Sequence, residues 1–98
     1  MDSKLIRDIL RDNREQVKDF GIKALYLFGS VVRNEATEAS DIDLLIEFED
    51  DVHIGLFGFA RLQRMLTNLL GCKVDLVTKD SLHKALRDRI LKEVVYAL

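Results

Sequence analysis

The chain has 98 residues, of which 48% are hydrophobic and 33% are charged, and its formal net charge is -2. We expect one domain over residues 1–98 with a modest core, because a domain this small buries only about 60 to 65% of the surface that its unfolded chain exposes. The net charge excludes a broad basic surface. A phosphate ligand should therefore be held locally, and nucleic acid is not the expected partner.

Cysteine usage and hydropathy indicate the compartment. Cys72 is the only cysteine, which excludes an internal disulfide and fits a reducing cytoplasm. No apolar run approaches the length of a membrane span, and the first ten residues lack the charged-then-apolar order of a signal peptide. We therefore expect a soluble cytoplasmic protein that does not contact a membrane.

The first part of the chain predicts a helix and a strand. Apolar residues recur at helical spacing over residues 4–19, with charged residues between them. Ser3 can cap the start of this helix, and Gly21 fits the position just after its end. An apolar run over residues 23–28 then predicts the first strand.

A turn, a loop and a second strand follow. Gly29 and Ser30 end the first strand, and residues 31–33 suit a short helix. The free N–H groups at such a helix start form a natural anion site. Turn-tolerant residues over 34–40 predict a loop, and the apolar run 42–48 predicts the second strand.

The last part of the chain predicts a helix, a strand and a helix. Apolar residues at helical spacing mark a long helix over 54–70, and alternation over 73–78 indicates a third strand. Asp80 or Ser81 can cap a final helix whose apolar side runs over residues 82–95.

The order of these elements predicts an α/β fold, with helices packed on a small mixed sheet of three strands. The first two strands suit antiparallel neighbours, whereas the helical connection from the second to the third suits a parallel crossover. This topology brings Ser30, at the end of the first strand, beside three carboxylates at the starts of the other two strands. These are Asp41, Asp43 and Asp75.

The spacing of the acids indicates a cation site. Side chains alternate along a strand, so Asp41 and Asp43 point the same way. Two close carboxylates repel each other unless a cation lies between them, and oxygen-only ligands favour magnesium, manganese or calcium. Taken alone, an Asp-x-Asp more often marks a turn or a cap, and Asp75 alone could be an acid paired with a lysine. The joint pattern favours a metal-chelated phosphate.

The same residues resemble a known signature. Gly29-Ser30, ten intervening residues, Asp41-Ile42-Asp43 and a later Asp75 are similar to the motif of the polymerase-beta-like nucleotidyltransferases. Within that superfamily the chain resembles the minimal nucleotidyltransferases, the MNT antitoxins that are encoded beside HEPN-domain toxins. The resemblance extends to the ending LHKALRDRILKEVVYAL. It implies a nucleotidyltransferase fold.

The resemblance also implies roles for the three acids. Asp41 and Asp43 would hold two magnesium ions that bridge the triphosphate of ATP. Asp75 would be the third carboxylate, next to the attacking hydroxyl, and would help to remove its proton. Two ions about 3.5 to 4 Å apart can stabilise both the entering and the leaving oxygen of a displacement at phosphorus.

The glycine turn has implied roles as well. Gly29 would let the backbone approach the phosphates, and Ser30 would contact them through its hydroxyl and N–H groups. Arg33 stands where the family usually has an arginine, available to a phosphate or to an acidic neighbour. Asn34 departs from the glycine of many relatives, although Asn tolerates a positive φ better than most residues.

The function implied by the resemblance is the transfer of AMP from ATP to a protein hydroxyl, a tyrosine, of a partner HEPN toxin. Larger relatives carry an additional acceptor domain that we do not find in this sequence, so a partner should present the acceptor. Two alternatives stay open. The protein could be an antitoxin that acts by binding alone, or an enzyme whose acceptor is a small molecule or a nucleic acid end. Homo-oligomerisation is also left open.

A partner surface is expected at the start of the helix over 54–70. Leu56, Phe57 and Phe59 cluster there, and a helix with one core-facing side cannot bury all three. Some apolar area should stay exposed, as at many interfaces. The alternative, that the core absorbs all three, stays open.

Overall fold

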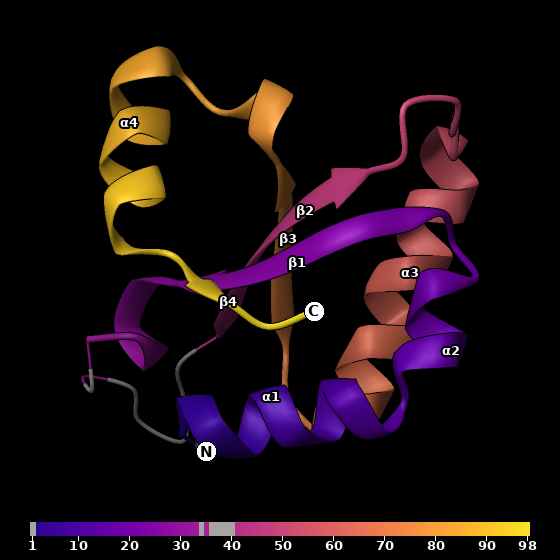
Figure 1. Cartoon of the computed structure of the whole chain (residues 1–98), viewed down its shortest axis with the longest axis horizontal. Helices are drawn as coiled ribbons and strands as arrows, with labels where there is room; N and C mark the ends of the chain where they lie inside the picture. Colours follow the sequence, from indigo (N-terminus) through magenta and orange to yellow (C-terminus); the bar gives the residue numbers. More distant parts are fainter. Residues whose placement is uncertain (1, 34, 36–40) are drawn as a thin grey trace.

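The computed structural model describes residues 2–33, 35 and 41–98. Its sheet has four strands in the order β3-β2-β1-β4, with helices on both faces (Figure 1). The predicted α/β class and the mixed sheet are confirmed. The strand count is four rather than three. The predicted loop over 34–40 falls, apart from Glu35, outside the described residues.

The predicted first helix is two helices. α1 spans Ser3–Asp12 and α2 spans Arg14–Lys18. The break falls at Asn13, whose side-chain amide donates to the Ile9 carbonyl at 2.8 Å and so competes with the helical backbone pattern. The cap is Asp2 rather than Ser3, because the Asp2 carboxylate accepts from the Leu5 N–H at 2.8 Å.

Three strands carry the register that the site depends on. β1 spans Ile22–Phe28, β2 spans Ile42–Phe48 and β3 spans Val74–Thr78. β1 and β2 are antiparallel, and β2 and β3 are parallel, as the connections predicted. Phe28 lies opposite Asp43, and Asp43 lies opposite Asp75. The end of β1 therefore meets the starts of β2 and β3.

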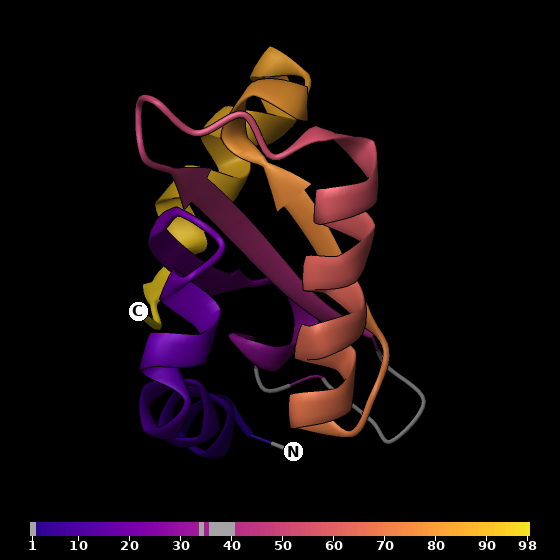
Figure 2. The same ribbon diagram turned by 90° about the vertical axis from the view of Figure 1, so that its right-hand side faces the viewer.

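The larger core lies between the sheet and the N-terminal helices with α3, which spans Gly55–Leu70. Leu62, Leu66 and Leu70 form its buried stripe, the spacing of one helix face. Gly71 ends α3 with a φ of 73°, a left-handed conformation that glycine adopts without strain. Figure 2 shows α3 lying along the sheet.

The opposite face of the sheet is covered by α4, which spans Lys84–Glu93. Phe28 and Leu45 from the sheet pack there with Ile90 of α4 in a second, smaller cluster. Side chains alternate between the two faces along a strand, so β1 and β2 contribute side chains to both hydrophobic clusters. Figure 1 shows α4 and α3 on opposite sides of the sheet.

The predicted final helix over 82–95 starts later and ends earlier than expected. A 3-10 turn, η2, spans Lys79–Ser81, and Thr78 caps it by accepting from the Ser81 N–H at 3.2 Å. At the other end Val95–Tyr96 form the short strand β4, antiparallel to β1. The β-branched pair before Tyr96 favours a strand, and pairing satisfies the otherwise open edge of β1.

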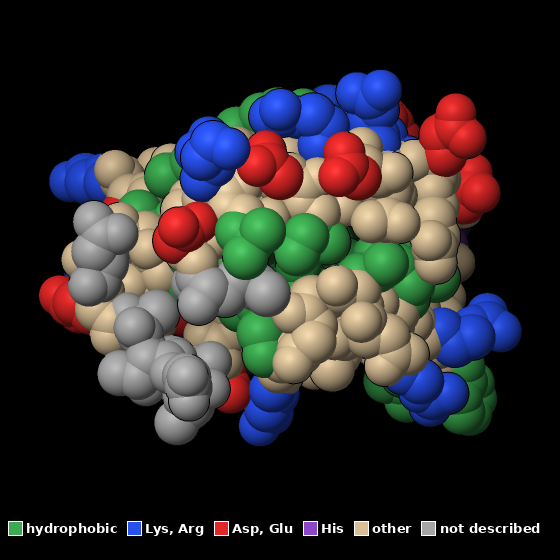
Figure 3. Space-filling view, turned by 90° about the horizontal axis from the view of Figure 1, so that it is seen from below, with side chains coloured by type: hydrophobic (Ala, Val, Ile, Leu, Met, Phe, Trp, Pro, Cys, Tyr) green, Lys and Arg blue, Asp and Glu red, His purple; other side chains and the backbone are tan. Residues whose placement is uncertain are grey.

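Charges of both signs alternate along one edge of the face in Figure 3. On α1, an ion pair joins Lys4 to Asp8 at 2.9 Å, and its hydrogen bond lowers the pKa of the Asp8 carboxyl. Within the described part of the chain, no helix is long and apolar enough to cross a membrane.

Candidate active site

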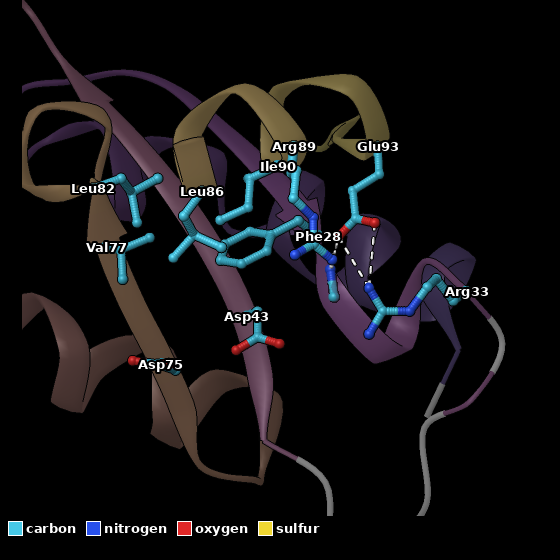
Figure 4. A pocket seen from close by; sticks show the side chains of 11 residues that line it. Phe28, Arg33, Asp43, Asp75, Val77, Leu82, Leu86, Arg89, Ile90 and Glu93 are labelled. Carbon is cyan, nitrogen blue, oxygen red and sulfur yellow. Dashed lines mark hydrogen bonds and ion pairs between the residues drawn. The ribbon is translucent and has the colours of Figure 1, made fainter. Parts of the chain in front are cut away.

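The candidate site lies where β1 ends beside the starts of β2 and β3, under α4. A cavity of about 320 Å³ opens there. One end of it is polar, with Gly29, Asp43 and Asp75, and Figure 4 shows both carboxylates at this end. The other end is apolar. Its wall is formed by Phe28, Val77, Leu82, Leu86 and Ile90.

Gly29 and Asp43 are in direct contact. The Gly29 backbone has a φ of 79°, a conformation that costs other residues roughly 1–2 kcal/mol. A Cβ added at this position would overlap the carboxylate of Asp43. Glycine is therefore required twice, for its backbone conformation and for the space that the carboxylate occupies. The short helix expected over 31–33 is instead a 3-10 turn, η1, over Gly29–Val31, and half-buried Ser30 is its middle residue.

The surroundings of Asp43 disfavour the ionised form of its carboxyl. Burial raises the pKa of its carboxyl, and the charges of Asp75, Asp41 and Glu93 raise it further, while Arg33 lowers it. The ionised carboxylate is thus the costly form in this protein. A divalent cation beside Asp43 would relieve that cost, so the donor set fits an oxygen-liganded metal.

The three predicted acids are not equally placed. Asp43 and Asp75 face each other across the parallel pair and both line the cavity. Asp41 is exposed just before β2, with its Oδ2 3.8 Å from the Nζ of Lys73. Among residues 2–33, 35 and 41–98, no three acidic, histidine or cysteine side chains are grouped closely enough to form a ready metal cage.

Arg33 contacts acidic neighbours. Its Nη1 donates to both carboxylate oxygens of Glu93 at 3.2 Å, and its Nε donates to Glu35 at 3.3 Å. These bonds, to Glu35 first and then to Glu93, raise the pKa of the guanidinium. Glu35 and Glu93 are thus the acidic neighbours of Arg33.

Glu93 is a site residue that the sequence did not indicate. Its Oε1 accepts a hydrogen bond from the Gly29 N–H at 3.1 Å, across 64 positions of the chain. Nothing in the local sequence marks this acid, because its role depends on α4 folding back over β1. Arg89, on the same helix, also lines the cavity, and Figure 4 shows its side chain extending toward Phe28.

Apolar side chains are exposed away from this cavity, at the start of α3. Leu56 is 80% exposed and Phe57 is 83% exposed, which confirms the expected apolar surface, while Phe59 is half-buried. Figure 1 shows the start of α3 beyond the far end of β2, away from α4. We call Leu56 and Phe57 the α3 patch.

Comparison with known proteins assigns the family. The profile of the nucleotidyltransferase domain family matches residues 6–97. The chain is 41% identical over 92 residues to protein adenylyltransferase MntA of Thermococcus cleftensis, an alignment that covers 93% of this chain and 91% of the relative.

Solved structures agree on the fold. A structure assigned to the minimal nucleotidyltransferases superposes with a TM-score of 0.73 at 38% identity, covering 97% of this chain and 95% of the other. A tri-AMPylated HEPN toxin in complex with its MNT antitoxin, from Shewanella oneidensis, matches with a TM-score of 0.62 at 23% identity, covering 97% of this chain and 71% of the other. At that identity the likeness shows the fold alone. The chain belongs to the nucleotidyltransferase domain family and, within it, is a relative of the MntA protein adenylyltransferases.

Proposed function

We propose that this nucleotidyltransferase transfers AMP from ATP, with magnesium, to a tyrosine hydroxyl of a partner HEPN toxin and thereby acts as an antitoxin. One observation carries the proposal. The Gly29 turn lies against the carboxylate of Asp43, which lies opposite Asp75 across two parallel strands. A polyphosphate with its cations needs this combination of close backbone approach and paired acids.

The three acids divide the work. Asp41, Asp43 and Asp75 would hold two magnesium ions, which when bound offset the charges on the entering and leaving oxygens. Asp75, at the cavity edge of β3, would take the proton of the attacking hydroxyl. That oxygen forms a bond to the α-phosphorus of ATP as the bond to pyrophosphate breaks, so AMP stays on the acceptor.

The turn and the apolar wall would place the two substrates. Gly29 allows the phosphates to approach the backbone, and Ser30 would contact them through its hydroxyl. Arg33 supports this turn through Glu93. The wall of Val77, Leu82 and Leu86 suits a flat ring such as that of a tyrosine brought in by the partner.

Protein modification is favoured by the relatives. The Thermococcus relative, 91% of whose length is aligned, is named as a protein adenylyltransferase. The Shewanella antitoxin with the same fold is bound to a HEPN toxin that carries AMP. These names support a protein acceptor over a small molecule or a nucleic acid end.

A second candidate function, inhibition by binding alone, is favoured by the α3 patch. Two large apolar side chains that are more than three quarters exposed commonly mark an interface. The patch lies away from the cavity and therefore would serve binding whether or not the cavity is active.

Label transfer tests the proposal. The protein is incubated with ATP labelled on the α-phosphate, magnesium and a HEPN toxin, the proposed partner, and we expect label on the toxin. Asp41→Asn/Asp43→Asn should lose transfer by at least about 100-fold, because losing the metal forfeits several kcal/mol of charge stabilisation. Asp50→Asn/Asp51→Asn removes the same two charges from an exposed turn and should transfer normally. Equal labelling by the two double variants would contradict the proposal.

A further inference from the structure

Glu93 joins three parts of the fold at the site. It is the last residue of α4, it accepts from the Gly29 N–H at the end of β1, and it binds Arg33 beyond the 3-10 turn through both carboxylate oxygens. Figure 4 shows the Glu93 and Arg33 side chains facing each other at the polar end of the cavity. The two Gly29 contacts, with Glu93 and with Asp43, lie on the same short turn.

We propose that Glu93 is a positioning residue for nucleotide binding and transfer, which holds the Gly29 turn against Asp43 by way of Gly29 and Arg33. This inference rests on the proposed function for the same site. The backbone at Gly29 is left-handed, so an unsupported turn has other conformations available to it. A carboxylate that takes both the Gly29 N–H and the Arg33 guanidinium selects one of them before ATP arrives, which lowers the cost of binding.

The ion pair between Arg33 and Glu93 fixes the position of the turn more than it stabilises the fold. The side chains of Arg33 and Glu93 are 48% and 30% exposed, and an ion pair that is screened by water to this extent contributes little to stability. The negative charge of Glu93 is offset by Arg33, so it does not oppose a phosphate as a free acid would. Removing Glu93 should therefore change the turn and the affinity for ATP more than it changes the folding.

The immediate test is the Gly29 amide. In Glu93→Ala we expect hydrogen exchange at Gly29 to become at least about tenfold faster, because the N–H loses its acceptor. Asp88→Ala removes an exposed acid from the same helix and should leave this exchange unchanged. Equal exchange in the two variants overturns the proposal, whatever the catalytic activity is.

The second test is the binding of magnesium ATP, measured by calorimetry without the toxin. Glu93→Ala should weaken binding by about tenfold, which corresponds to 1.4 kcal/mol. Glu93→Gln keeps an oxygen for the Gly29 N–H and should lie between the alanine variant and the native protein. In steady-state transfer the loss should appear in KM for ATP before kcat. Binding that is unchanged, or tighter, in Glu93→Ala overturns the proposal, since tighter binding would mean that Glu93 occupies the place of a phosphate.

A double-mutant cycle that combines Glu93→Ala with Arg33→Ala tests whether Glu93 acts through Arg33. If Glu93 acts partly through Arg33, the double variant should bind ATP more tightly than the product of the single effects predicts. Strict additivity contradicts that route. A native protein that binds ATP but never labels the toxin would refute the proposed acceptor and leave the role of Glu93 standing.

Discussion

At the scale of single residues, the site depends on close contacts that larger side chains would disrupt. The Asp43 carboxylate fills the space that a side chain at position 29 would need, and its own ionised form is opposed by burial and by neighbouring acids. Burial and neighbouring acids disfavour the ionised carboxylate in the protein without ligands. The same two features suit the site to a cation and a phosphate.

Gly29→Ala should separate the two reasons for glycine at that position. Left-handed backbone alone costs roughly 1–2 kcal/mol, and Gly71→Ala, with a φ of 73° and open space around it, measures that part in urea denaturation. Gly29→Ala should cost more than this control and should also abolish binding of magnesium ATP. Equal stability losses, with ATP binding intact in both, would show that the Asp43 contact is unimportant.

Asp43→Asn should stabilise the metal-free protein at neutral pH. Folding raises the pKa of Asp43, so the native protein favours the protonated acid and loses stability as the pH rises through the folded pKa. The amide has no charge to lose. In thermal denaturation with EDTA, the variant should melt above the native protein at pH 7, and the difference should vanish below the ordinary aspartate value of 3.8.

The exposed substitution Asp50→Asn is the control for that comparison and should show no such pH dependence. Magnesium should raise the melting temperature of the native protein more than that of Asp43→Asn, because only the former keeps the full ligand set. A variant that melts below the native protein at pH 7 would place Asp43 in a structural network instead.

At the scale of elements, the longer helices and strands could be predicted from the sequence and the shortest could not. β1, β2, β3 and α3 have apolar patterns long enough to be recognised, and their connections predicted the directions of the strand pairs. The register that places Asp43 opposite Asp75 is known only from the structure. β4 has two residues and exists through its pairing with β1, which no local pattern records. No local pattern predicts the role of Glu93 either, because its contacts form only when α4 packs back over the end of β1.

The α3 patch makes its own prediction. Phe57→Ser should change the free energy of unfolding by no more than about 0.5 kcal/mol, because the side chain is already in water, whereas Leu66→Ala, at a fully buried position of the same helix, should cost about 2–5 kcal/mol. Sedimentation with the toxin should show weaker association for Phe57→Ser. Unfolding of this variant, or unchanged association, would remove the case for a partner surface.

At the scale of the whole molecule, the surfaces that support the two candidate functions lie at opposite ends of the sheet. The cavity lies under α4 at the start of β2, and the α3 patch lies beyond the end of β2. Under the proposed function, the protein would bind its partner with one surface and modify it with another. Only the cavity, however, requires acids that repel one another, which a protein that acts by binding alone has no physical reason to keep.

Stoichiometry measures the central claim most directly. The protein is mixed with a large excess of a HEPN toxin, ATP and magnesium. The toxin is then analysed by intact-protein mass spectrometry and assayed after the protein is removed. We predict that most toxin molecules carry AMP and stay inactive. The contrary result is an unmodified toxin, inhibited only at equimolar protein and equally well by Asp41→Asn/Asp43→Asn.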